Sequence, residues 1–237
     1  MLLRTLYLLA LSFGLATTAG SAQALTFVDQ DFICPVGGEK FKAKVVGSQT
    51  SFGQRLDLRP LGALVAPNPL PVCPNGFVMF KERFSLDEIV KLSSVFLTPE
   101  YQAARKAHTS YYLAAYLMER NGADAYALGL VYLRAMWQVE SDPTPERPIE
   151  YRSLALAKLE AFLSDNKERD SRWWTAAILA SELERQAGRF DESVKRLDAL
   201  PVTELKTDAP EVLVLEQIRK HALERNPKPE RLVAKQN

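Results

Sequence analysis

The chain has few of the residues on which metal and catalytic sites most often depend. Its 237 residues include only two cysteines, Cys34 and Cys73, and two histidines, His108 and His221. A structural zinc site needs four ligands, usually Cys or His, and the histidines lie far from the cysteines in the sequence. We therefore predict no metal and no cofactor. Either histidine could act as a general base only with a partner that the sequence does not reveal.

The common catalytic motifs are also absent. The sequence contains no G-x-S-x-G, H-E-x-x-H, P-loop or G-x-G-x-x-G pattern. Asp29 and Asp31 lie close together, but the rest of an EF-hand's oxygen set is missing, so we interpret them as solvated turn residues. These absences favour a protein that is not an enzyme and leave an enzyme as the alternative.

Excess charge of either sign is lacking too. With 30 basic and 29 acidic residues the formal net charge is +1, and it falls to zero without Arg4 of the first 24 residues. This balance gives no electrostatic footprint for nucleic acid, so we predict no nucleic-acid partner. The basic segment 219–237 is an exception, which we interpret as a basic helix end followed by a flexible tail over residues 226–237.

Long apolar runs are confined to the first residues of the chain. Arg4 precedes an apolar run over residues 5–16, and Ala22-Gln23-Ala24 fits the A-x-A cleavage rule. The run is shorter than the roughly 20 residues of a membrane-spanning helix. We therefore predict a Sec-type signal peptide over residues 1–24, cleaved after Ala24. The mature protein would be a periplasmic or secreted bacterial protein without stable membrane insertion.

Residues 25–84 are rich in Gly, Pro, Val and Phe and are predicted to form a small β and loop module. Residues 40–45 alternate strictly between lysine and apolar residues, which predicts a half-buried strand. Residues 26–28 and 76–80 are two further strand candidates. The stretch 61–74 contains four prolines and is predicted to be an extended loop.

From Ser85 onward the pattern is helical. Ser85 and Glu88 fit a capping box, and Pro99 suits the first position of a second helix. The dipeptide Glu-Arg recurs at residues 119 and 184, a spacing of 65 residues that is close to twice the 34-residue period of tetratricopeptide repeats. We predict an α+β chain, mostly α, with a TPR-like antiparallel helical stack over residues 85–225. The predicted helices span residues 85–96, 99–121, 124–140, 147–164, 168–187, 190–199 and 209–225.

Cys34 and Cys73 each open a C-P-x-G turn. In an exported chain an even number of cysteines favours pairing, so we predict a disulfide between them. Loop entropy gives such a bridge, over about 39 residues, a stabilisation of roughly 4 kcal/mol at most. A thiol-redox or metal role for the two cysteines is the alternative, although exchanging pairs usually lie within one C-x-x-C turn.

Together with Arg55-Leu56-Asp57 and Asn68-Pro69-Leu70, these turns resemble a bacterial domain of unknown function, DUF2225, over roughly residues 32–84. The resemblance implies two C-P-x-C zinc knuckles followed by TPR-like helices. Gly37 and Gly76 stand where the second cysteine of each knuckle is expected, so the family's metal is not carried over. We interpret the two turns as a zinc knuckle in which a disulfide has replaced the metal.

Two sets of residues are candidate binding sites. Arg55, Asp57 and Arg59 alternate with leucines, so a strand would place all three charges on one face, where they could hold a carboxylate or phosphate. The alternative is an ion-pair clamp between the β part and the helices. Tyr112 and Trp174 each follow another aromatic residue, and adjacent residues cannot share one helix face. They are therefore candidate exposed anchors for a peptide, with packing between helix layers as the alternative.

These patterns favour a periplasmic interaction or scaffold protein whose helical stack binds a protein or peptide partner. One alternative is an enzyme or small-ligand binder with a site at the junction of the two parts of the chain. The other is a thiol-redox or metal protein that uses the two cysteines. The sequence does not specify the partner or the oligomeric state.

Overall fold

The computed structural model describes residues 25–142 and 146–234, so the predicted signal peptide lies outside the described residues. The fold is α+β and mostly α, as predicted from the sequence. Its strands are β1 (Thr26–Ile33), β2 (Lys40–Ser48), β3 (Thr50–Gln54) and β4 (Pro60–Ala63). Its helices are α1 (Leu86–Phe96), α2 (Pro99–Ala107), α3 (Ser110–Arg120), α4 (Ala125–Gln138), α5 (Glu146–Asp165), α6 (Ser171–Gln186), α7 (Phe190–Ala199) and α8 (Pro210–Leu223).

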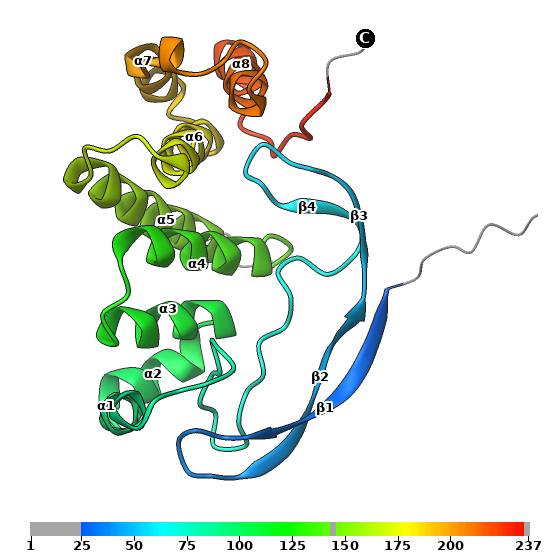
Figure 1. Cartoon of the computed structure of the whole chain (residues 1–237), viewed down its shortest axis with the longest axis vertical. Coiled ribbons are helices and arrows are strands. Elements are labelled where there is room, and N and C mark those ends of the chain that lie inside the picture. The colour runs from blue at the N-terminus through cyan, green and yellow to red at the C-terminus, as the bar shows by residue number, and fades with distance from the viewer. Residues whose placement is uncertain (1–24, 143–145, 235–237) are drawn as a thin grey trace, which may run out of the picture.

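The helices follow one another as an arc of stacked neighbours (Figure 1). Gly122 and Gly188 end α3 and α6 with φ angles of 93° and 77°, a conformation that glycine adopts without strain. Gly129 lets α4 and α5 approach closely, because a Cβ at this position would lie 2.8 Å from a methyl carbon of Leu159. None of the helices in residues 25–142 and 146–234 has the length and hydropathy required to cross a membrane.

The single helix predicted over residues 99–121 is wrong, because α2 and α3 are separate helices. His108 ends α2 in an extended conformation, and Thr109 precedes α3 in another. The hydroxyl of Tyr151, from α5, accepts the amide of Thr109 at 3.4 Å and lies 3.0 Å from Nδ1 of His108. A contact across the fold therefore stabilises a break that the local pattern does not signal.

The strands form two antiparallel pairs, the ribbon β1–β2 and the hairpin β3–β4. Figure 1 shows that they cross the open side of the helical arc, from α1 and α2 at one end to α6 and α8 at the other. The predicted strands at residues 26–28 and 40–45 lie within β1 and β2. The predicted strand at 76–80 is wrong, because this stretch forms only the bridge between Val72 and Val78. Its apolar residues, such as Phe77, are buried against helices.

One hydrophobic core joins the amino-terminal part of the chain to the helices. Cys34, Cys73 and Phe77 belong to the same buried cluster as Leu92 of α1 and Leu133 of α4. A second cluster unites α6, α7 and α8 with Leu56, from the turn after β3. The module predicted over residues 25–84 therefore packs its ends into the helical stack and has no separate core.

Residues 226–234 are not a free tail, in contrast to the prediction for 226–237. Leu56 donates its amide to Glu230 O at 2.9 Å, and Leu232 donates to Gln54 O at 2.9 Å. This carboxy-terminal segment extends the β3–β4 hairpin by one short backbone pairing and lies against α6 (Figure 1). The backbone groups of an exposed hairpin edge are thereby satisfied.

Candidate functional site

The Arg-Asp-Arg row predicted at residues 55–59 does not lie on a strand. The strand β3 ends at Gln54, and the chain turns over residues 55–59, where Leu58 has a φ of 66°. Asp57 is fully buried and accepts two hydrogen bonds from Arg55, one of them from Nε at 3.0 Å. Both arginines also bind one carboxylate of the helical part, Glu140, with Arg55 Nη1 at 2.5 Å from Glu140 Oε1.

These contacts leave the row no spare charge for an anionic ligand. Burial alone would lower the pKa of Arg55, but the hydrogen bonds and charges of Asp57 and Glu140 outweigh burial and raise that pKa. The three predicted residues are brought together as the clamp between the β part and the helices, which was the structural alternative. They are not available as an open binding row.

The partners of this clamp were not identified in the sequence. The indole Nε1 of Trp137 donates to Asp57 Oδ2 at 3.1 Å, and Gln186 approaches the same oxygen at 3.5 Å. These residues lie 80 and 129 positions from Asp57. No local pattern links positions so far apart, although a Trp or Gln on a buried helix face signals a polar partner in general.

A second buried ion pair lies beside the clamp on α6. Glu182 and Arg185 are both fully buried, with Arg185 Nε donating to Glu182 Oε2 at 2.8 Å. The remaining donors of Arg185 bind the carbonyls of Asn226 and Lys228 in the carboxy-terminal segment. Burial raises the pKa of Glu182 above its ordinary value, although Arg185 opposes this effect. The pair therefore fixes the carboxy-terminal segment against α6.

The two aromatic candidates do not form an exposed pair of anchors. Trp174 is only 6% exposed and packs in the second core cluster between α6 and α8. Tyr112 is half-buried and stacks on His108, with ring centroids 3.7 Å apart, beside Tyr132 and Tyr151. Packing between helix layers, which was the alternative interpretation of the sequence, explains both positions.

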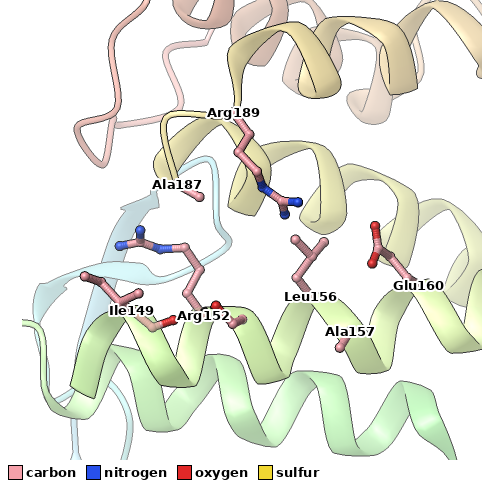
Figure 2. A pocket seen from close by; sticks show the side chains of 8 residues that line it. Ile149, Arg152, Leu156, Ala157, Glu160, Ala187 and Arg189 are labelled. Carbon is pink, nitrogen blue, oxygen red and sulfur yellow. Dashed lines mark hydrogen bonds between the residues drawn. The ribbon is translucent and has the colours of Figure 1, made fainter. Parts of the chain in front are cut away.

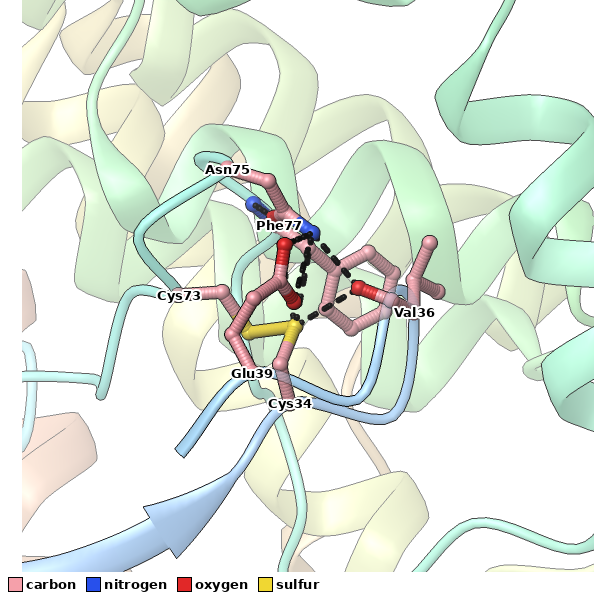
Figure 3. The surroundings of a disulfide bond; sticks show 6 residues. All are labelled: Cys34, Val36, Glu39, Cys73, Asn75 and Phe77. Atoms are coloured by element: carbon pink, nitrogen blue, oxygen red, sulfur yellow. Dashed lines mark hydrogen bonds between the residues drawn. A yellow bond between two sulfur atoms is a disulfide. The ribbon is translucent and has the colours of Figure 1, made fainter. Parts of the chain in front are cut away.

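The predicted disulfide between Cys34 and Cys73 is confirmed, with a Cα–Cα distance of 5.6 Å. Figure 3 shows the two C-P-x-G turns facing each other across this bond, with Asn75 reaching from one turn to the other. Asn75 Nδ2 donates to Val36 O at 2.5 Å and to Glu39 Oε1 at 3.2 Å. The cysteines are 1% and 3% exposed, so a redox partner has no direct access to either sulfur.

Gly37 and Gly76 occupy the positions where the resemblance to DUF2225 expects cysteines. Their φ angles are 105° and 91°, a region that side chains other than glycine rarely adopt. A Cβ at Gly76 would also overlap the guanidinium of Arg105, at 1.8 Å from Nη2. Among the described residues, no three His, Cys, Asp or Glu side chains come together as ligands for a metal ion.

A mainly apolar depression near the helical arc, which we call the hollow, has a volume of about 360 Å³. Its wall is formed by α3 and α4, and its rim by two residues of the preceding loop, Leu70 and Phe80. The hydroxyl of Tyr111 fixes this loop by donating to Asn68 O at 2.8 Å. The lining residues are Leu70, Phe80, Tyr111, Ala114, Met118, Tyr126, Ala127, Leu130, Val131 and Arg134.

One charged side chain lines the hollow. Arg134 forms no ion pair within the part of the chain that the structure describes. An apolar cavity with a single uncompensated cation suits a ligand with apolar groups and one acid. A second cavity of about 330 Å³ adjoins the hollow, because Leu70 and Phe80 line both. The ribbon contributes Phe32 and Val45 to this second cavity.

A larger cavity than the hollow, about 530 Å³, lies between α5 and the turn that joins α6 to α7. Figure 2 shows Arg189 extending over Leu156, with Arg152 and Glu160 on either side. Glu160 is paired with Arg196, whereas the hydrogen bond that Arg152 donates among the described residues goes to the carbonyl of Gln186, at 3.0 Å. Burial lowers the pKa of Arg152 from its ordinary value.

Comparisons with protein-family models, with curated proteins and with solved structures gave no match for this chain. The resemblance to DUF2225 therefore stays a prediction. The functional argument rests on the geometry of the chain's own residues.

Proposed function

We propose that this is an exported interaction protein that binds an extended, apolar segment of a partner protein in the hollow between α3, α4 and the loop at residues 70–80. The single observation that supports the proposal best is the hollow itself, with a volume of about 360 Å³ and a mainly apolar lining. It includes Arg134, which forms no ion pair with any described residue. The bound segment would carry a carboxylate beside its apolar residues, opposite Arg134.

The lining favours a peptide over a rigid small molecule. Met118 is flexible and polarisable and adapts to side chains of different shape. Tyr126 adds an aromatic surface of the kind that dominates binding energy at protein interfaces. The continuation of the hollow into a second cavity past Leu70 and Phe80 gives an extended segment further room.

Export to an oxidising compartment is part of the proposal. A buried disulfide between Cys34 and Cys73 is characteristic of secreted and periplasmic proteins and is rare in the cytosol. The signal-like pattern over residues 1–24 supports the same compartment.

The proposal is tested by peptide selection on the purified protein. A random-peptide display library is selected on the wild type and on Ala127→Arg, which places a charged side chain in the hollow. We expect enrichment of apolar peptides with an acidic residue on the wild type, and at least tenfold weaker binding of these peptides to the variant. Val90→Arg is the matched control, because Val90 is 69% exposed on α1 and does not line the hollow.

The charge of the selected peptides provides a second criterion. Arg134→Glu should shift the selected peptides from acidic to basic residues, because the only charge in the hollow is reversed. Equal selection on the wild type and Ala127→Arg, or no enrichment on either, would contradict the proposal.

A small anionic ligand is the second candidate, favoured by the cavity beside α5. Arg152 and Arg189 line this cavity without forming an ion pair with any acidic residue in the described ranges. Titration with inorganic phosphate or citrate, compared between the wild type and Arg189→Ala, tests this candidate. Equal titration curves would reject it.

A further inference from the structure

The ribbon β1–β2 is only partly covered by the rest of the fold. No residue of either strand is buried, although the strands are eight and nine residues long. An isolated two-stranded ribbon is marginally stable in water and usually needs a third strand or a covered face. This ribbon is held at its ends by the disulfide at Cys34 and by the continuation of β2 into β3. Between these ends, its backbone hydrogen bonds join only its own two strands, among the described residues.

The outer edge of β1 is open to another strand. Apart from the pairing with β2, no backbone hydrogen bond joins residues 26–33 to any described residue. In an antiparallel pair, alternate residues of an edge strand direct both N–H and C=O away from the partner. These groups form a template that a further strand can use.

The two faces of the ribbon differ in chemistry. Cross-strand partners share a face, so Phe32 pairs with Phe41 on one face, with ring centroids 5.6 Å apart. This face is directed to the helices, because Phe32 and Phe41 pack against the main core. Val28 and Val45 continue it along the ribbon.

The other face of the ribbon carries charges in rows. Asp29 pairs with Lys44 at 3.3 Å, and Asp31 pairs with Lys42 at 3.7 Å. All four side chains are more than half exposed. A strand beside β1 would therefore meet the two acids Asp29 and Asp31 on one face, between Phe27 and Ile33. On the other face it would meet Val28 and Phe32, with Gln30 between them.

We propose that an extended segment of a partner protein adds to the outer edge of β1 as a third strand, with basic and apolar residues in alternation. The basic residues lie opposite Asp29 and Asp31, and the apolar residues lie beside Val28 and Phe32, toward the cavity that adjoins the hollow. The inference rests on the proposed function, since it names how the partner is held and the chemistry of one of its segments.

Charge disfavours two other pairings of these edges, one at the outer edge of β2 and one between two copies of β1. Lys40, Lys42 and Lys44 lie along β2, and lysines on an edge strand oppose strand addition. Two copies of β1 joined in antiparallel fashion about Gln30, which gives the fullest overlap of this strand, would place Asp29 of one opposite Asp31 of the other. Joining β1 of one copy to β2 of the next leaves the same free edges at both ends and builds a filament instead of a closed dimer.

The test uses a synthetic peptide with the sequence of β2, Lys40–Ser48, because this is the strand that β1 already pairs with. One control peptide has its three lysines replaced by glutamates, and a second has the same composition in an order without alternation. Binding is measured by fluorescence anisotropy, and hydrogen exchange of the β1 amides is followed by NMR on the full mature chain. We expect the β2 peptide to bind at least tenfold more tightly than either control and to slow exchange in β1.

The charge-reversed variant D29K/D31K should prefer the glutamate peptide, and the neutral variant D29N/D31N should lose the preference. Hydrogen exchange of the core amides, measured on each variant without peptide, shows whether that variant is folded. If D29K/D31K is not folded, the test is made with D29N/D31N. Equal binding of the three peptides, unchanged exchange in β1, or association of the free protein into filaments on sedimentation would each overturn the proposal. If the β2 peptide does not bind but the selection on the hollow yields peptides, the strand addition is rejected and the proposed function is retained.

Discussion

At the scale of single residues, Asp57 is the position on which most of the junction depends. Its buried carboxylate accepts hydrogen bonds from Arg55, from the indole of Trp137 and from the amide of Arg59 at 3.2 Å. These donors belong to the turn after β3 and to α4. A single side chain therefore orients two parts of the fold relative to one another.

Asp57→Asn should destabilise the protein strongly. The substitution removes the charge that compensates the buried guanidinium of Arg55, and loss of one partner from a buried pair costs about 3–5 kcal/mol. Urea unfolding gives the change in the free energy of unfolding. Asp29→Asn is the matched control and should cost less than about 1 kcal/mol, because its pair with Lys44 is exposed. Equal losses in the two variants would contradict the assigned role.

Glu88 connects stability to pH through the capping box of α1. Hydrogen bonds from Lys81, the amide of Ser85 and Asn121 lower the pKa of Glu88 to about 2, from an ordinary value of 4.5. A carboxyl with a lowered pKa stabilises the fold above its unfolded pKa, and this contribution disappears as pH falls through the folded pKa. The melting temperature should therefore fall between about pH 4.5 and pH 2.

Glu88→Gln isolates this contribution. Its melting temperature should be lower than that of the wild type at pH 6, and the difference should shrink as pH approaches 2. Thermal unfolding followed by circular dichroism measures both. A difference that does not change with pH would show that the charge of Glu88 is not the cause.

At the scale of elements, two segments have a structure that depends on distant parts of the chain. The break between α2 and α3 is stabilised by Tyr151 of α5. The carboxy-terminal segment, residues 226–234, is ordered by β3 on one side and by Arg185 of α6 on the other. From its own sequence alone, the first segment is predicted to be part of one helix, and the second is predicted to be a flexible tail.

Deleting residues 226–237 should release the β3–β4 hairpin. The deletion leaves Arg185 without the carbonyls of Asn226 and Lys228, and it frees the amide of Leu56. Because unsatisfied buried donors cost about 1–3 kcal/mol each, we expect a loss of at least about 2 kcal/mol. Hydrogen exchange of the amides in β3 and β4 should accelerate in the same variant.

Arg231→Ala is the control for this deletion. It removes an exposed side chain and retains the backbone pairing of the segment with β3. We expect exchange in the hairpin close to that of the wild type. Fast exchange in Arg231→Ala would show that the side chain, and not the backbone pairing, holds the segment.

At the scale of the whole molecule, the β strands form a strap that is fixed at both ends and open in the middle (Figure 1). At one end, the disulfide and Asn75 join the two C-P-x-G turns inside the main core. At the other end, Asp57 and its partners join the strap to α4 and α6. The unburied ribbon between these ends is the part that we propose for partner binding.

Replacing both cysteines, Cys34→Ala with Cys73→Ala, should lower the free energy of unfolding by roughly 2–4 kcal/mol, because a covalent loop is lost from the unfolded chain. The bond joins residues 39 positions apart. Urea unfolding with and without reductant measures the effect. Reductant in the denaturant should destabilise the wild type by a similar amount and leave the double variant unchanged. A loss below about 1 kcal/mol would contradict this prediction.

The sequence predicted those features that depend on local pattern. The helix at residues 190–199 was predicted with its observed bounds, and the helix start at Ser85 was placed by its capping box. The strand within β2 followed from alternation of lysine and apolar residues. The disulfide was predicted because a chain with a predicted export signal contains an even number of cysteines, two in all. Each of these features follows from the sequence of one segment or from the number of residues of one type.

Tertiary structure decided the features that depend on partners far along the chain. Alternation at residues 55–59 gave no sign of a turn, because the partners that stabilise it are Glu140, Trp137 and Gln186. The apolar run at 76–80 fits a strand locally, but its residues are buried by helices. The hollow exists only where α3 and α4 meet the loop at residues 70–80. Periodicity specifies which face of an element is apolar, whereas the packing of distant elements determines what that face contacts.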